Sequence, residues 1–183
     1  MTQLSAAATA MDSISVDPLV ALIGLPADQL RLFVIWILQF PVGYFLHFSI
    51  HGAFQRHCVN LLLGLLGMSY FYGADMMHVF FMGMGSYLIM AVLPRDKSYL
   101  FVCVYAFSYL SVSHIHAVLY HFGSYDLDIT TNTMLLTLRL IALAFSFSDG
   151  GKDPKELTDR QKQMMVKELP SVLEMLSYTF FVQ

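Results

Sequence analysis

The chain has 183 residues, of which 57% are hydrophobic and only 13% are charged. A water-soluble domain of this size could not bury so much apolar side-chain surface in one core, so the composition predicts a membrane protein. The net charge is only −3, and the sequence has no basic clusters. These features argue against nucleic acid as a partner.

The apolar residues fall into runs that can be compared with the thickness of a bilayer. A helix needs about 20 residues to cross roughly 30 Å of hydrocarbon. On that scale the sequence predicts spans near 30–49, 58–73, 76–93, 99–119 and 133–148, and a sixth apolar helix from Pro170. No run alternates apolar and polar residues with a period of two, as barrel strands would. We therefore expect an all-α fold, a polytopic transmembrane bundle of about five to six helices.

The second and fifth runs are short, so we expect these two helices to tilt little or to lie among other helices. Residues 1–28 contain no Lys or Arg, unlike the basic start of a signal peptide, so the first span is predicted to be an uncleaved anchor. The chain then divides into a polar N-terminal segment, residues 1–29, and a transmembrane portion, residues 30–183.

The basic residues favour one orientation of the bundle. Lys and Arg concentrate in cytoplasmic loops. If every span crosses, one side carries Arg56, Arg95, Lys97, Lys152, Lys155, Arg160, Lys162 and Lys167, and the other side carries only Arg31. The bias predicts a luminal N-terminal segment and a cytosolic loop at 149–169.

This cytosolic loop contains helix-start signals. Asp153 before Pro154 is typical of a capped helix with proline in its first turn, and Thr158 to Gln161 fits a capping box. The stretch RQKQMMVKEL, from Arg160, mixes charged and apolar residues. It fits an amphipathic helix in the headgroup region, and an ordinary charged linker helix equally well.

Histidines lie within or beside several spans, where polar groups usually face the bundle interior. His47 and His51 form an H-x-x-x-H pair on one helical face, a spacing that can bind a metal. The other histidines do not complete such a set, because His114 and His116 point to nearly opposite faces of a helix. We therefore predict core or interfacial histidines and no metal site.

Arg139 lies in the middle of the fifth run, where a cation needs a partner or a water-filled cavity. One interpretation is a structural tether to a carbonyl or an acid elsewhere in the bundle. The other is a positive wall for an anionic headgroup or phosphate. The sequence pattern alone leaves both open.

The third run, between Met76 and Met90, is rich in methionine and contains Gly83 and Gly85. Small and flexible side chains of this kind predict a surface at which helices approach closely. Cys58 and Cys103 fit two buried thiols better than a disulfide. No Ser-His-Asp, Cys-His or glycine-rich phosphate motif is recognisable in the sequence.

Three separated blocks resemble membrane-bound O-acyltransferases (the MBOAT family), and within it the lysophospholipid acyltransferases. They are FQRHCVNLLLGLLGMSYFYG with the following MHVFFMGMGSYLIM, then YHFGSYDLDITTNTMLLTLRLIALAFSFSDG, then KELPSVLEMLSY. The second block carries the features that match the family pattern, namely Tyr125, Asp128, Met134, Arg139 and Asp149-Gly150. The resemblance covers roughly residues 30–183, as an incomplete, N-terminal part of the family's fold.

The resemblance implies transfer of an acyl group from acyl-CoA to a lysophospholipid in the endoplasmic reticulum membrane, with no cofactor beyond the acyl-CoA co-substrate. Tyr125, Asp128 and Arg139 are then the candidates for lining the substrate site. The family's presumed base, a histidine, and its assisting asparagine follow the block that ends at Tyr178. No histidine here matches that position, so no catalytic residue is expected in this chain. The alternative is an inactive truncated membrane protein that binds lipid or partners.

Overall fold

The structure, a computed structural model, describes residues 52–120, 129–153 and 155–181, with isolated positions between Gly24 and Ile50. From residue 52 onward its elements are α4 (Ala53–Tyr72), the 3-10 turn η1 (Gly73–Asp75), α5 (Met76–Val92), α6 (Arg95–Tyr120), α7 (Ile129–Asp149), α8 (Asp159–Met164) and α9 (Val172–Phe180). No strand occurs among these described residues. The all-α prediction is confirmed.

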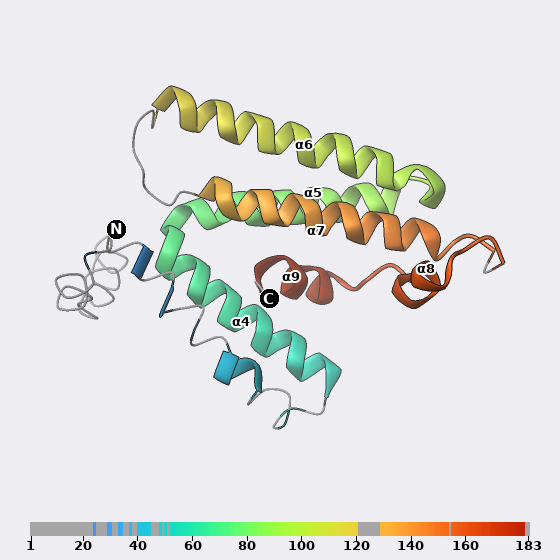
Figure 1. Cartoon of the computed structure of the whole chain (residues 1–183), viewed down its shortest axis with the longest axis horizontal. Coiled ribbons are helices and arrows are strands. Elements are labelled where there is room, and N and C mark those ends of the chain that lie inside the picture. Colours follow the sequence, from blue (N-terminus) through green and yellow to red (C-terminus); the bar gives the residue numbers. More distant parts are fainter. Residues whose placement is uncertain are drawn as a thin grey trace.

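The long helices α4 to α7 pack as a bundle in which consecutive helices run in opposite directions (Figure 1). Helix α6 packs on α5 and α7, while α9 packs on α4 and α5. The core where α5, α6 and α7 meet is fully excluded from solvent at Val79, Met82, Val102, Ala106 and Leu140. Apolar side chains also cover much of the outer surface of α6, where Val104 is 60% exposed and Ile115 is 59% exposed. Such a surface suits lipid as the surrounding solvent.

Three helical stretches in the described part are long and apolar enough to cross a membrane: Ala53–Val92, Arg95–Tyr120 and Ile129–Asp149. The first contains both α4 and α5, which are separated by η1. Gly73 ends α4 with φ at +56°, and its N–H donates to the Ser69 carbonyl. A residue with a Cβ is strained at this φ, so glycine suits the point at which the chain turns back.

The predicted second to fifth spans each coincide with a helix, but the second and fifth helices are longer than the apolar runs from which they were predicted. Helix α4 has 20 residues and α7 has 21. Each begins several residues before its apolar run, because polar residues such as Gln55, Arg56 and Thr131 continue the helical hydrogen bonding outside the run. The sixth run forms α9, which has only nine residues. The predicted span at 30–49 lies mostly outside the described residues.

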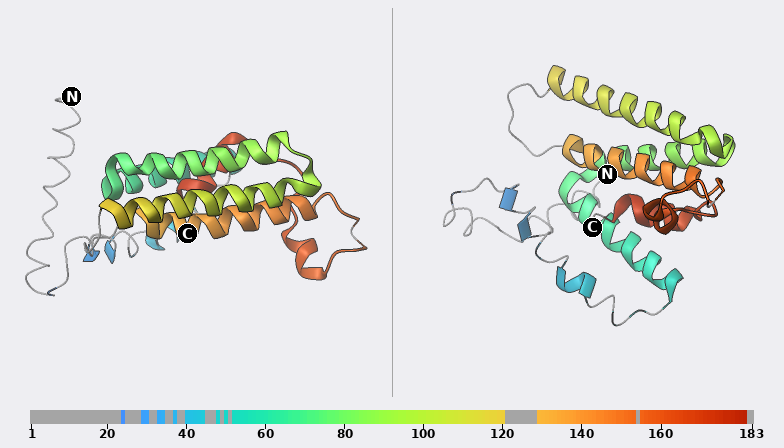
Figure 2. Two further views of the ribbon diagram at one scale, coloured as in Figure 1. Left: turned by 90° about the horizontal axis from the view of Figure 1, so that it is seen from above. Right: turned by 45° about the vertical axis from the view of Figure 1, so that its right-hand side comes forward.

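The helix ends and loops that carry most of the basic residues lie at one end of the bundle. Figure 1 places the start of α4, the α5–α6 connection and the end of α7 on the same side, and the left view in Figure 2 shows α8 and its loop projecting from that side. The count of Lys and Arg assumed that successive loops lie on alternate sides of the membrane. The directions of α4 to α7 agree with this assumption. Which side faces the cytosol stays a prediction.

Candidate functional site

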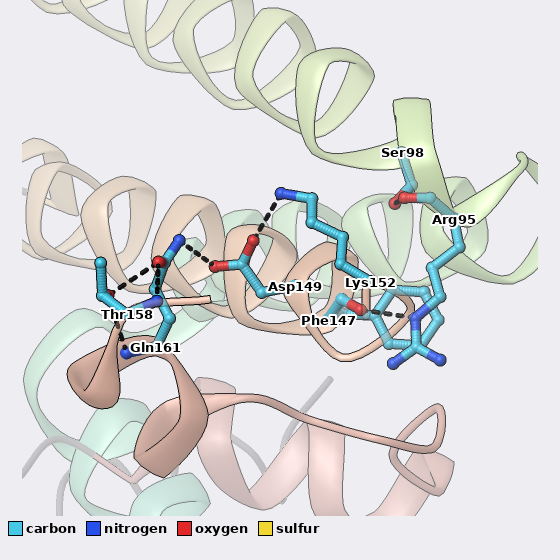
Figure 3. Close-up of polar contacts among 7 residues, drawn as sticks. All are labelled: Arg95, Ser98, Phe147, Asp149, Lys152, Thr158 and Gln161. Atoms are coloured by element: carbon cyan, nitrogen blue, oxygen red, sulfur yellow. Dashed lines mark hydrogen bonds and ion pairs between the residues drawn. The ribbon is translucent and has the colours of Figure 1, made fainter. Parts of the chain in front are cut away.

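Arg95, the first residue of α6, joins three segments at this end of the bundle, and Figure 3 shows its hydrogen bond to Phe147. Its Nε donates to the Phe147 carbonyl at 2.5 Å, and its terminal nitrogens donate to the carbonyls of Val166 and Lys167. The guanidinium also lies 4.3 Å from the centre of the Phe147 ring. One cation thus satisfies carbonyls left free at the end of α7 and in the segment after α8.

Asp149, the last residue of α7, makes a second set of contacts beside Arg95. One carboxylate oxygen accepts from Lys152 Nζ at 2.6 Å, and the other accepts from Gln161 Nε2 at 3.1 Å. The hydrogen bond to Asp149 raises the pKa of Lys152 above its ordinary value. Gln161 also closes the capping box of α8 with Thr158, so one side chain links the end of α7 to the start of α8.

Gly150 follows Asp149 in the pair that matches the family pattern. A Cβ at this position would collide with the Val166 carbonyl and with the Arg95 guanidinium. Val166 in turn donates its backbone N–H to the Ser146 carbonyl at 2.9 Å. Glycine is therefore needed because two backbone segments pass too closely for any side chain.

These contacts correct the predicted shape of the 149–169 loop. The capping box at Thr158 is confirmed, but α8 ends at Met164, and residues 165–170 are not helical. Met165 is extended, and the hydrogen bonds to Ser146 and Arg95 hold Val166 and Lys167 outside a helix. Asp153 caps no helix, and its Oδ1 instead accepts the backbone N–H of Lys155. Placement of this loop in the headgroup region stays a prediction.

Arg139, which is half-buried on α7, contacts the end of α9. Its two terminal nitrogens donate to the Tyr178 carbonyl at 2.6 Å and to the Phe181 carbonyl at 3.1 Å. The Tyr178 ring lies 4.4 Å from the guanidinium, and the Tyr178 hydroxyl donates back to the Arg139 carbonyl. These hydrogen bonds fit the interpretation of Arg139 as a structural tether to backbone carbonyls elsewhere in the bundle. Contact between Arg139 and a substrate stays a prediction, while Tyr125 and Asp128 lie outside the described residues.

The histidines in the described part form ordinary packing contacts. His57 Nδ1 lies 2.7 Å from Ser177 Oγ, and His78 Nδ1 lies 2.8 Å from the Tyr109 hydroxyl. Ser177 already donates to the Glu174 carbonyl and is only 3% exposed. The His57–Ser177 pair therefore links α4 to α9, and its geometry does not present a nucleophile to a substrate. His47 and His51 lie outside the described residues.

The close helix approach predicted for the methionine-rich run is confirmed. A Cβ on Gly83 would lie 2.6 Å from a methyl of Thr179, and a Cβ on Gly85 would collide with the Tyr105 ring. The sequence pattern, by contrast, indicates Arg95 only as one of the charges that orient the bundle. The position of this residue directly after Pro94, in the connection between the third and fourth predicted spans, was the available signal that it lies beside the ends of other helices.

No model of a known protein family matches the chain. Individual proteins do. The chain is 32% identical to the rat membrane-bound glycerophospholipid O-acyltransferase 2 over 89% of its length, which is 33% of that protein. It is 26% identical to the human membrane-bound glycerophospholipid O-acyltransferase 1 over 88% of its length, which is 34% of that protein. The Drosophila melanogaster lysophospholipid acyltransferase 6 is 32% identical over 75% of the chain.

These relatives confirm the resemblance found in the three sequence blocks. The chain spans about one third of the length of the membrane-bound glycerophospholipid O-acyltransferases that it matches. Arg95, Arg139 and Asp149 are accordingly residues of a helical framework within that third. Over about nine tenths of its length, the chain is homologous to a segment of the membrane-bound O-acyltransferases of the lysophospholipid acyltransferase group.

Proposed function

We propose that this chain is part of a lysophospholipid acyltransferase, which transfers an acyl group from acyl-CoA to the free hydroxyl of a lysophospholipid. The observation that carries the proposal is similarity over about nine tenths of the chain to proteins named as glycerophospholipid O-acyltransferases and as a lysophospholipid acyltransferase. The three apolar helical stretches support it, because the acceptor is itself a membrane component.

The physical chemistry of the reaction suits a helical chamber in a bilayer. Acyl-CoA has a soluble nucleotide end and an acyl tail that prefers lipid, while the lysophospholipid already lies in the membrane. A protein wall that opens to both phases brings thioester and hydroxyl together and keeps water from hydrolysing the thioester. Helices α4 to α7 would form part of this wall, in the membrane of the endoplasmic reticulum, with Tyr125, Asp128 and Arg139 as proposed lining residues.

The chain alone would not catalyse the reaction under this proposal. The acceptor hydroxyl must lose a proton as it attacks the thioester, and the family's presumed histidine base matches no histidine here. General-base catalysis alone typically contributes about 10²–10⁴-fold. The role of this segment is then to position substrates and to exclude water, together with the remaining two thirds of a protein of the relatives' length.

A second candidate is a membrane protein without enzymatic activity that binds lipid or a partner. The three apolar helical stretches fit this candidate as well as they fit the first. The lipid composition of cells that lack the gene distinguishes the two candidates. An acyltransferase predicts a rise in at least one lysophospholipid class and a matching change in the acyl composition of its phospholipid product, both restored by the complete gene product. An unchanged lipid profile would contradict the acyltransferase proposal.

A further inference from the structure

Asn60 places an amide side chain in α4, within a stretch that is long and apolar enough to cross a membrane. It lies about 10 Å along the helix from Ala53. The side chain is half-buried, and no group among the described residues hydrogen-bonds it. An amide removed from water without a hydrogen bond costs free energy, so polar groups inside spans generally pair with a partner. Asn60 therefore needs a partner outside the contacts described above.

Asn60 shares one face of α4 with Arg56, Leu63 and Gly67. Intervals of four, three and four residues keep these positions on the same side of a helix. Arg56 is exposed, and one of its terminal nitrogens donates to the Ile50 carbonyl at 3.1 Å. In the described part of the chain Arg56 forms no ion pair. Its other N–H groups are therefore available to an anion.

Gly67 borders open space farther along this face. A Cβ added at Gly67 would have no atom within 4 Å, whereas a Cβ added at Gly64 would lie 2.7 Å from the Phe180 backbone. Gly64 thus packs directly on α9, and Gly67 does not. Leu63, which is half-buried, adds apolar surface between Asn60 and Gly67.

The order of these groups along α4 matches the order of the groups in a glycerophospholipid. Arg56 lies near the start of α4, at the end of the bundle that carries most of the basic residues. Asn60 follows about 6 Å farther along the helix, and Gly67 about 10 Å beyond that. From the membrane surface inward, a phospholipid presents an anionic phosphate, a glycerol with ester carbonyls or a hydroxyl, and an acyl chain. A guanidinium suits the phosphate, and an amide can both donate to a carbonyl and accept from a hydroxyl.

We propose that this face of α4 binds a glycerophospholipid, with its phosphate on Arg56, its glycerol region on Asn60 and its acyl chain along Leu63 and Gly67. The opposite charges at Arg56 and the free hydrogen-bonding groups of Asn60 favour a phospholipid over a purely apolar occupant. Phospholipids with one or two acyl chains share this chemistry. The binding is a property of α4, and it does not depend on which reaction the complete protein performs.

The test measures cross-linking of a labelled phospholipid that carries a diazirine in its acyl chain, in membranes that contain the complete gene product. After irradiation and trypsin digestion, the yield on the fragment that contains α4 is divided by the yield on α6. The outer surface of α6 reports general contact with lipid, because its apolar side chains, such as Val104, are exposed. We expect α4 to be labelled in the parent protein.

Arg56→Gln and Asn60→Leu should each lower this ratio about fivefold, because each removes a hydrogen bond to the lipid. Asn60→Gln, which keeps the amide, should retain most of the labelling. The matched controls are Arg160→Gln, at an exposed cation of the same end of the bundle, and Gln55→Leu, at an exposed amide on another face of α4.

Two further measurements separate the parts of the lipid. Gly67→Leu should lower the ratio by occupying the place of the acyl chain, since the protein itself has room for the added side chain. A diacylglycerol with the same labelled chain lacks the phosphate. Its cross-linking to α4 should therefore be weaker, and it should respond to Asn60→Leu but not to Arg56→Gln.

Equal ratios for Asn60→Leu and Gln55→Leu would overturn the role of Asn60, and equal ratios for Arg56→Gln and Arg160→Gln would overturn the role of Arg56. A parent protein without label on α4 would overturn the site as a whole. That result is expected if another protein segment, and not a lipid, covers this face.

Discussion

Replacement of Arg95 by Ala should loosen the 149–169 loop from the end of the bundle. The side chain donates to three carbonyls, of which those of Phe147 and Val166 are in part-buried contacts and that of Lys167 is exposed. A hydrogen bond to a charged group contributes about 1.5–3 kcal/mol, and an exposed carbonyl regains much of this from water. With about 1–2 kcal/mol assigned to each part-buried bond, Arg95→Ala should destabilise the loop by about 2–4 kcal/mol.

Limited trypsin digestion measures this opening, because the loop contains cleavable residues such as Lys155 and Lys162. A local destabilisation of about 2–4 kcal/mol corresponds to cleavage at least about 30-fold faster when opening and closing of the loop are fast relative to cleavage. Lys97→Ala is the matched control, since this exposed cation lies in the same turn of α6. Arg95→Lys should fall between the two, because an ammonium cannot reach three carbonyls. Equal cleavage rates for Arg95→Ala and Lys97→Ala would refute the reasoning.

Two further predictions concern the same end of the molecule. A glycosylation acceptor in residues 1–29 should be modified and one at Lys155 should not; the reverse pattern would invert the orientation predicted from the charge bias. Lys152 has a pKa raised by Asp149, so its ion pair stabilises the fold fully below the ordinary lysine pKa and is lost as the pH rises through the folded value. The apparent unfolding temperature should therefore decline at alkaline pH more in the parent than in Lys152→Met, and parallel curves would contradict this.

The fold class could be predicted because it follows from the hydrophobic composition and the long apolar runs, which are properties of the whole chain. Four apolar runs coincide with α4 to α7, and the breaks between them follow from local chemistry, as at Gly73, where φ is +56°. The capping box at Thr158 was likewise predictable, since both partners lie within one turn of each other. The predicted helix lengths were less accurate, because a polar residue at the end of an apolar run can either continue the helix or end it.

The long-range contacts could not be predicted from the sequence. Arg95 and Val166 are 71 residues apart, and Arg139 and Phe181 are 42 apart. The residues next to Arg139 in the sequence do not indicate whether its partner is a backbone carbonyl, an acidic side chain or a phosphate. Likewise, Gly64 and Gly67 are alike in sequence, and only the packing of Phe180 distinguishes them.

Acyl transfer itself tests the central proposal most directly. Membranes that lack endogenous activity would receive the complete gene product, the chain alone or an empty vector, followed by labelled acyl-CoA and a panel of lysophospholipids. We predict labelled phospholipid with the complete product, and none above the vector background with the chain alone. No product from the complete protein with any acceptor would contradict the assignment to the lysophospholipid acyltransferases, and product from the chain alone would place a catalytic base among its own histidines.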